Sequence, residues 1–211
     1  MPDEPGYKLF WEALSGAMAV ELFLEQAGIA YERIPIDMAS GEHKSAAFLS
    51  LNPTGQIPAL MLPSGQVIGE SAAILLLLGE RHPDCRLVPL PGSADRPGFL
   101  RWLVYMAASP YMTFVQFNHP ERFLADRQAH GPLIENARAR LLDQFTLLND
   151  AIAGEPYFQR AGLSALDLYL YMLIEFFADR DTVYSGRDRL AGLHRAVSGL
   201  ASTRRVRPRH G

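Results

Sequence analysis

Residues 51–74 read LNPTGQIPALMLPSGQVIGESAAI, and this stretch decides the fold of the first part of the chain. Short apolar runs at 59–62 and 66–68 flank a Pro-Ser-Gly turn, a pattern that predicts a β-hairpin. Glu70 and Ser71 then stand directly before another apolar run, where a helix would begin. The start of a helix leaves backbone N–H groups free and carries partial positive charge, so it suits an anionic ligand.

The residues before this stretch predict a strand, a helix and a second strand. Residues 7–11, YKLFW, are rich in aromatic side chains and indicate the first strand. A helix is expected over 17–27 and ends at Gly28, and the second strand follows over 31–36. Pro35 lies inside that strand and favours a position at the edge of the sheet. With the hairpin and a helix at about 70–81, the predicted order is βαβ and then ββα.

The order NPxGQ(V/I)P, hairpin and ES-x-A-I resembles the glutathione site of cytosolic glutathione transferases. The resemblance implies a thioredoxin-like N-terminal domain in which the peptide bond before Pro58 is cis. It also implies that the backbone of Ile57 pairs with the cysteine of glutathione. Glu70 and Ser71 would hold the γ-glutamyl end, with Gln56 as a further contact.

A second pattern, GEH…FLxxNP, resembles the delta-like members of the same family. The resemblance implies that His43 contacts the glycine end of glutathione. Lys44 is an alternative cation for that carboxylate, and a solvated loop position for His43 is the alternative that involves no ligand.

Activation of glutathione requires a thiolate, because the thiolate is the nucleophile. Lowering the thiol pKa by roughly two units needs about 2.7 kcal/mol. One charge-assisted hydrogen bond supplies ~1.5–3 kcal/mol, and a helix N-terminus adds ~0.3–2 kcal/mol. Ser15 is the only hydroxyl or thiol in the strand–helix junction WEALSGAMA, and it matches the serine of delta/theta-like transferases. The resemblance implies a catalytic role for Ser15, whereas a plain helix N-cap is the alternative.

The same junction departs from the family in two respects. The cysteine of the beta-class bacterial enzymes would fall on Gly16, which argues against a cysteine-dependent mechanism. Glu12, Ala13 and Leu14 replace the common turn of the family, and this difference bears on activity more than on fold.

A segment at 84–96, rich in Pro and Gly, predicts a linker between a thioredoxin-like domain at 1–83 and an all-helical C-terminal domain at 97–211. Ser164 and Asp167 form an S-x-x-D variant of the capping box, which is also a feature of the transferase C-terminal domain. Helices are expected at 98–112 with a bend at Ser109-Pro110, at 133–152, at 168–178 and at 190–200.

The composition, 48% apolar and 20% charged over 211 residues, is typical of a globular protein. A net charge of −3 gives no reason to expect nucleic acid or an anionic membrane as a partner. The single cysteine, Cys85, excludes dithiol chemistry, and the histidines show no metal-ligand spacing. We expect a cytoplasmic location, because the acidic N-terminus shows no signal pattern. The basic residues Arg204, Arg205, Arg207 and Arg209 are interpreted as a solvated tail.

The resemblance therefore implies a glutathione transferase that acts in detoxification. It would use glutathione as co-substrate, need no metal, attack a small apolar electrophile and form a homodimer. Two alternatives stay open. One is another glutathione-dependent reaction, such as disulfide reduction, isomerisation or reductive dehalogenation. The other is a non-catalytic binding module of the same fold. The aromatic and methionine residues at 102–117 are either core or the wall of the second substrate's pocket.

Overall fold

The computed structural model describes residues 6–211, which form two compact units. The first unit extends to Ser93 and includes the C-terminal segment Ser198–Gly211, and the second unit is Ala94–Val197. The expectation that the chain has no signal segment was drawn in part from residues 1–5, which lie outside the described residues.

A mixed sheet of four strands lies in the first unit, in the order β2-β1-β3-β4. The central strand β1 runs parallel to β2 and antiparallel to β3, and β3 and β4 form the predicted hairpin. The edge position that Pro35 predicted for β2 is confirmed. The strands are β1 (Tyr7–Trp11), β2 (Tyr31–Pro35), β3 (Ala59–Met61) and β4 (Val67–Ile68).

Helix α1 (Ala17–Ala27) follows β1 with the predicted bounds and ends at Gly28, whose φ of 67° is the left-handed conformation that favours glycine. It contacts β1, α3 (Ser71–Arg81) and α10 (Ala201–Val206), so even its polar Glu21 has no exposed surface. The short α2 (Ala46–Leu51) precedes the hairpin. This arrangement of sheet and helices is the thioredoxin-like fold that the resemblance implied.

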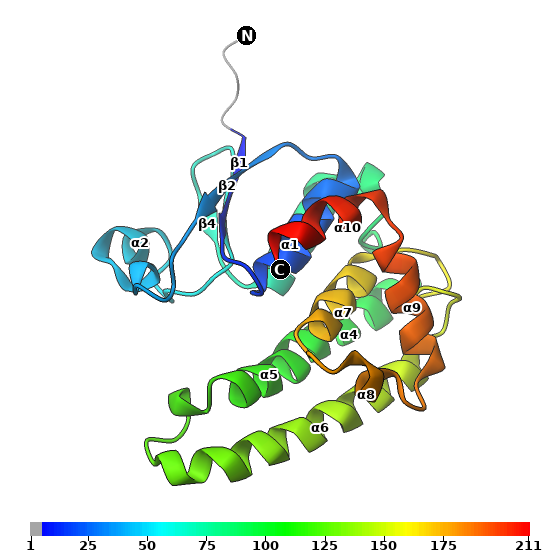
Figure 1. Ribbon diagram of the computed structural model, residues 1–211. Helices are drawn as coiled ribbons and strands as arrows, with labels where there is room; N and C mark the ends of the chain where they lie inside the picture. Colours follow the sequence, from blue (N-terminus) through cyan, green and yellow to red (C-terminus); the bar gives the residue numbers. More distant parts are fainter. Residues whose placement is uncertain (1–5) are drawn as a thin grey trace. The chain divides into compact units, whose positions relative to one another are not determined.

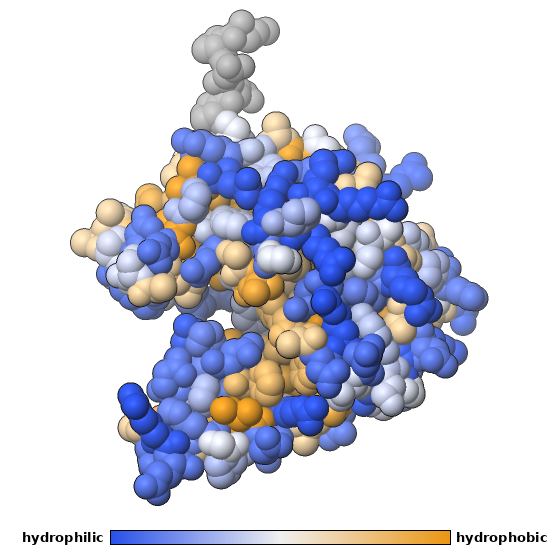
Figure 2. All heavy atoms as spheres, in the orientation of Figure 1, coloured by the Kyte–Doolittle hydropathy of each residue, from blue (hydrophilic) through white to orange (hydrophobic). Residues whose placement is uncertain are grey.

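The C-terminal segment packs against α1, and the two lie side by side in Figure 1. Val206 and His210 are buried, and Arg209 pairs with Glu21, so the interpretation of a solvated basic tail is wrong for this part of the segment. Arg204 and Arg207 are exposed, and Figure 2 shows hydrophilic side chains over α10. The segment belongs to the first unit because these buried residues face α1, whereas the sequence-based division assigned it to the helical domain.

The second unit is helical. Its helices are α4 (Arg96–Ala108), α5 (Pro110–Asn118), α6 (His130–Ala151), α7 (Ala165–Glu175), α8 (Arg180–Tyr184) and most of α9 (Asp188–Ser198). The chain breaks at Ser109 as expected, since Pro110 cannot donate a helical hydrogen bond. The central helix α7 is buried along nearly its whole length and begins with the predicted capping box.

No helix within residues 6–211 is long and apolar enough to cross a membrane. Nor do three or more histidine, cysteine, aspartate or glutamate side chains come together there in a group that could hold a metal ion.

Candidate functional site

The turn that enters β3 is held by the side chain of Asn52. Its amide Nδ2 donates to the carbonyl oxygen of Gln56 at 2.8 Å, and its Oδ1 accepts from the hydroxyl of Thr54 at 3.0 Å. Asn52 is 5% exposed, whereas Gln56 is exposed. The Ile57–Pro58 peptide bond is cis, as the resemblance implied. The motif therefore forms a fixed turn that places the backbone of Ile57 at the entrance of the strand.

The side chain of Ile57 fixes this turn to the rest of the first unit. It belongs to a core cluster that contains Phe10 of β1, Phe48 of α2 and Ala17, the first residue of α1. The cluster therefore connects the turn to the N-terminal end of α1, which Ser15 closely precedes.

Glu70 and Ser71 lie where β4 gives way to α3. Glu70 is the N-cap residue of α3, is exposed and has a φ of 61°, a left-handed conformation that is rare for a residue with a side chain. Ser71 is the first helical residue. A Cβ atom added to Gly69 would lie 3.5 Å from Asn52 Oδ1, so this junction adjoins the turn that Asn52 holds. The structure therefore brings Gln56, Ile57, Glu70 and Ser71 together around one buried asparagine.

His43 and Lys44 lie in a short 3₁₀ helix, Glu42–Lys44, next to the same turn. Lys44 Nζ donates to the carbonyl oxygens of Gly55 at 3.2 Å and Thr54 at 3.4 Å. A Cβ atom on Gly55 would lie 2.9 Å from both His43 O and Lys44 Nζ, so only glycine fits at this position, where φ is 59°. His43 Nδ1 is buried and has no hydrogen-bond partner among residues 6–211.

Ser15 lies in the tight turn between β1 and α1. Its hydroxyl donates to the carbonyl oxygen of Glu12 at 2.8 Å and accepts from the backbone N–H of Ala17 at 3.2 Å. The helix α1 is assigned Gly16 as its N-cap residue, one position after the Ser15 that the alternative named. The Ser15 hydroxyl nevertheless satisfies the N–H of the first helical residue.

A buried cluster behind this turn was not predicted from the sequence. The Glu21 carboxylate accepts hydrogen bonds from Arg209 at 2.6 Å, His210 at 2.9 Å, Tyr31 at 2.9 Å and the Trp11 indole at 3.0 Å. Burial acts to raise the pKa of Glu21, but these hydrogen bonds outweigh it and the pKa is lowered. Arg209 and His210 are 188 and 189 positions from Glu21, so no local pattern could reveal the pairing.

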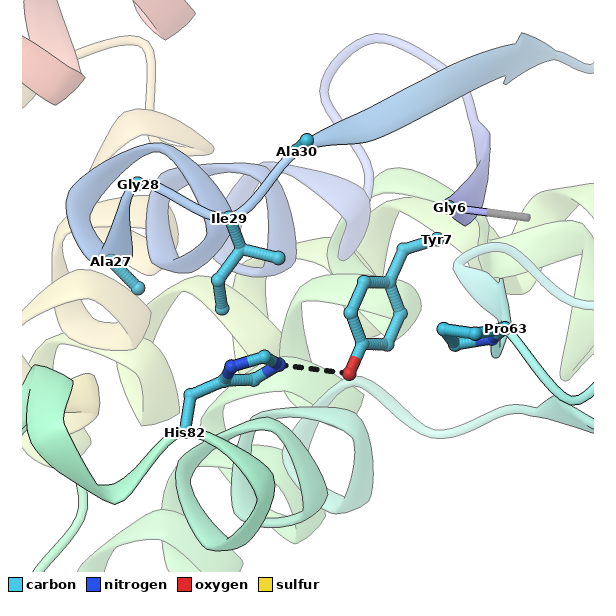
Figure 3. A pocket seen from close by; sticks show the side chains of 8 residues that line it. All are labelled: Gly6, Tyr7, Ala27, Gly28, Ile29, Ala30, Pro63 and His82. Carbon is cyan, nitrogen blue, oxygen red and sulfur yellow. Dashed lines mark hydrogen bonds between the residues drawn. The ribbon is translucent and has the colours of Figure 1, made fainter. Parts of the chain in front are cut away.

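A shallow pocket of about 450 Å³ lies at the opposite end of β1 and α1 from Ser15. Figure 3 shows Tyr7 and His82 at its centre, joined by a hydrogen bond of 2.9 Å between the hydroxyl and Nε2. None of the predicted site residues lines it. We therefore assign the site from the geometry around Asn52 and not from this cavity.

The chain is similar to known proteins both in sequence and in structure. The family model described as glutathione S-transferase, N-terminal domain, matches residues 17–81. The uncharacterized GST-like protein YncG of Escherichia coli (strain K12) is 30% identical over 92% of this chain and 94% of its own length.

Two solved structures resemble the whole chain. A glutathione transferase homologue from Sulfitobacter, with bound glutathione, matches with a TM-score of 0.88 at 18% identity, over 97% of this chain and 98% of that one. A sphingomonad glutathione S-transferase complexed with glutathione matches with a TM-score of 0.79 at 25% identity, over 94% and 96%. The extent and identity of the match to YncG, with the fold, show that the chain belongs to the cytosolic glutathione transferase superfamily.

Proposed function

We propose that this protein is a glutathione transferase of the serine type, in which the Ser15 hydroxyl holds the thiolate of bound glutathione. The observation that carries the proposal is the arrangement around Asn52, which brings the cis Ile57–Pro58 turn and the Glu70–Ser71 junction together. The first offers an extended backbone edge to a peptide-like ligand. The second offers a carboxylate, a hydroxyl and the start of an eleven-residue helix to its charged end.

The two ends of glutathione then have distinct binding groups. Glu70 carries the negative charge that suits the α-ammonium group, and Ser71 with the first N–H groups of α3 suits the α-carboxylate. At the other end, His43 and Lys44 are both candidates for the glycine carboxylate. Lys44 donates to two carbonyl oxygens of the turn and keeps a third N–H, whereas His43 Nδ1 is buried, so a contact from His43 would come from its other ring nitrogen.

Ser15 would donate a hydrogen bond to the thiolate after its hydroxyl hydrogen rotates away from its present acceptor. In the unliganded turn its hydroxyl donates to Glu12, so a bound thiolate must take that donor in place of the carbonyl. The Ala17 N–H continues to donate to the Ser15 oxygen and polarises the hydroxyl toward the sulfur. One such bond to a charged acceptor contributes about 1.5–3 kcal/mol, which matches the stabilisation that a lowered thiol pKa requires.

Disulfide reduction through an enzyme thiol is the less favoured alternative. Cys85, the single cysteine, lies at the end of the 3₁₀ helix Pro83–Cys85 and not in the turn before α1. Burial raises the pKa of its thiol, the opposite of what a reactive cysteine needs. The non-catalytic alternative has one observation in its favour, which is that the Ser15 hydroxyl is already satisfied by its own turn.

Several further parts of the proposal follow from the family. The second substrate would be a small apolar electrophile, the biological role detoxification, the location cytoplasmic and the assembly a homodimer. Their support is membership of the superfamily, to which the match with YncG and the fold assign the chain.

The deciding experiment combines binding with turnover. The wild type should bind immobilised glutathione and conjugate it to a chlorodinitrobenzene-type electrophile in preference to reducing hydroxyethyl disulfide. Ser15→Ala should lower turnover by roughly 10–100-fold and leave glutathione affinity nearly unchanged. Ser50→Ala is the matched control, because the exposed Ser50 hydroxyl, like that of Ser15, donates to the carbonyl oxygen three residues before it.

The outcomes separate the three candidates. Failure of the wild type to bind glutathione would refute the proposed function altogether. Binding without measurable conjugation or reduction would favour the non-catalytic module. Normal turnover by Ser15→Ala would show that another group activates the thiol.

A further inference from the structure

Leu14, the residue before Ser15, has an unusual backbone and an unusual partner. Its φ of 51° is in the left-handed region, which branched side chains rarely adopt, and its side chain is 58% exposed. Packing of the leucine therefore does not explain the conformation. Its backbone N–H, however, donates to Nδ1 of His210 at 3.2 Å, at the opposite end of the chain. Backbone strain of this kind persists where the surroundings hold it in place.

The hydrogen bonds of His210 identify its tautomer. Because Nδ1 accepts from Leu14, the ring proton lies on Nε2, which donates to Glu21 Oε2 at 2.9 Å. The Trp11 indole nitrogen is 3.0 Å from that oxygen and 3.3 Å from His210 Nε2. Since Nε2 already carries a proton, we assign the indole hydrogen to the carboxylate. His210 is thus an acceptor on one side and a donor on the other.

On the side of the ring away from Leu14, His210 contacts the buried Glu21 and the half-buried Trp11. Glu21 has no exposed surface and comes from the middle of α1, and it also accepts from Arg209 and Tyr31. The imidazole packs edge-on against the Trp11 ring, with a centroid distance of 5.1 Å. His210 itself is 1% exposed. The ring is therefore fixed by its neighbours, and its second nitrogen is directed to the turn that carries Ser15.

We propose that His210 is a positioning residue for Ser15. Glu21 orients the imidazole, the imidazole holds the Leu14 N–H, and the resulting left-handed turn sets the direction of the Ser15 hydroxyl. His210 touches no substrate. This role rests on the proposed function, because it matters for catalysis only where Ser15 activates glutathione.

Two variants of His210 separate its two hydrogen bonds. In His210→Asn the side-chain oxygen reaches the place of Nδ1 and can accept from Leu14, whereas contact with Glu21 is lost. In His210→Gln the longer side chain places its NH₂ near Nε2 and can donate to Glu21, whereas the bond to Leu14 is lost. Both variants remove the ring and its packing on Trp11, so each serves as the structural control for the other.

The first readout is the backbone itself. The Leu14 amide should exchange with solvent roughly tenfold faster in His210→Gln than in His210→Asn, because only the former lacks its acceptor. This measurement needs no glutathione. Equal exchange in the two variants would overturn the proposal that the imidazole holds the turn.

The second readout is the ionisation of bound glutathione, followed by the ultraviolet absorbance of its thiolate across pH. In His210→Gln the thiol pKa should rise by about one unit, with kcat lowered roughly tenfold and KM for glutathione little changed. In His210→Asn, which keeps an acceptor for the Leu14 N–H, the thiol pKa and kcat should both change less than in His210→Gln. Adding Ser15→Ala to His210→Gln should raise the pKa by less than Ser15→Ala does in the wild type, because the two residues act as one unit.

The two proposals fail in different ways. A Ser15→Ala variant with an unchanged thiol pKa would overturn the proposed role of Ser15 and the positioning role with it. A raised pKa in Ser15→Ala together with an unchanged pKa in His210→Gln would overturn the role of His210 alone.

Discussion

Two carboxylates without exposed surface, Asp167 in the helical unit and Glu21 in the sheet-containing unit, are satisfied in contrasting ways. Asp167 accepts from the backbone N–H groups of Phe158 at 2.6 Å and Ser164 at 2.7 Å, and from the Ser164 hydroxyl at 3.0 Å. These partners lie within nine positions along the chain. Glu21 accepts from Arg209 and His210 of the C-terminal segment and from Tyr31 and Trp11 of the sheet, and Arg209 brings a positive charge.

The difference in partners gives the two groups opposite electrostatics. Burial raises the pKa of Asp167 to about 6, because backbone and hydroxyl donors do not offset the loss of hydration. Burial also acts to raise the pKa of Glu21, but hydrogen bonds from His210 and Arg209 bring it below its usual range. A local cap thus stabilises a loop without any countercharge, whereas a charge cluster joins distant segments.

The largest effect should follow from Asp167→Ala. Two buried backbone N–H groups, of Phe158 and Ser164, would lose their acceptor, and each such loss costs about 1–3 kcal/mol. We expect the helical unit to lose about 4 kcal/mol of unfolding free energy. Trp102 packs against Phe158, so its fluorescence in urea, recorded in a Trp11→Phe background, reports on this unit.

Trp11 lies beside Glu21 and reports on the other unit, which should unfold at an unchanged urea concentration when Asp167 is replaced in a Trp102→Phe background. A loss below about 1 kcal/mol in the helical unit would contradict the view that the cap is the main support of the loop at 158–164.

The pH dependence should differ in sign between the two carboxylates. The pKa of Asp167 is raised in the folded state. The stability that Asp167 contributes to the helical unit is therefore fully present below about pH 4 and is lost as the pH rises through about 6. A pKa difference of about two between the folded and unfolded states corresponds to about 3 kcal/mol. The pKa of Glu21 is lowered from 4.5, so its contribution is present above pH 4.5 and is lost as the pH falls through the lowered value.

Urea midpoints between pH 4 and 7, followed by Trp102, measure the first of these effects. Asp167→Asn does not titrate and should show a flatter profile for the helical unit. A difference between the wild-type and Asp167→Asn profiles that stays constant from pH 4 to 7 would contradict a raised pKa for Asp167.

The contrast between the carboxylates also explains what could be predicted from the sequence. The capping box was recognised because Ser164 and Asp167 are three positions apart, and the hairpin and the cis Ile57–Pro58 turn lie within one continuous motif. The cluster around Glu21 could not be recognised, because a glutamate in an apolar helix and an arginine in a basic tail gave no sign of each other. The tail was interpreted as solvated for that reason.

The candidate site likewise contains residues joined by short-range contacts and a turn held by a long-range contact. Asn52, Gln56, Ile57, Glu70 and Ser71 come together through short-range contacts that follow from the motif. The placement of Ser15 depends in addition on the contact between Leu14 and His210, which joins the two ends of the chain. The residues proposed to bind glutathione could therefore be predicted from one stretch of sequence, whereas the contact that supports the turn of Ser15 could not.

A smaller effect is expected for Glu21→Gln, which keeps the volume of the side chain and removes its charge. Charge-assisted hydrogen bonds are about twice as strong as neutral ones, so the loss of charge should cost the first unit about 2 kcal/mol. Glu25→Gln is the matched control, since Glu25 lies one helical turn away on α1 and its side chain is 16% exposed. Urea unfolding followed by Trp11 fluorescence should show a clearly smaller loss of unfolding free energy for the control. Equal losses would mean that the burial of Glu21 does not strengthen its contribution to stability.

The smallest effect should come from Arg205→Ala. Arg205 Nε donates to Glu25 at 2.8 Å, but the arginine side chain is 52% exposed, and exposed ion pairs contribute about 0–1 kcal/mol. We expect a loss below about 1 kcal/mol that shrinks further in high salt, measured by Trp11 fluorescence in urea. Arg209→Ala should cost more, because Arg209 is 28% exposed and serves the buried Glu21. If Arg205→Ala were as costly as Glu21→Gln, surface pairs would hold the C-terminal segment. In that case the surface contacts of α10, and not the buried Glu21 carboxylate, would hold His210 in place.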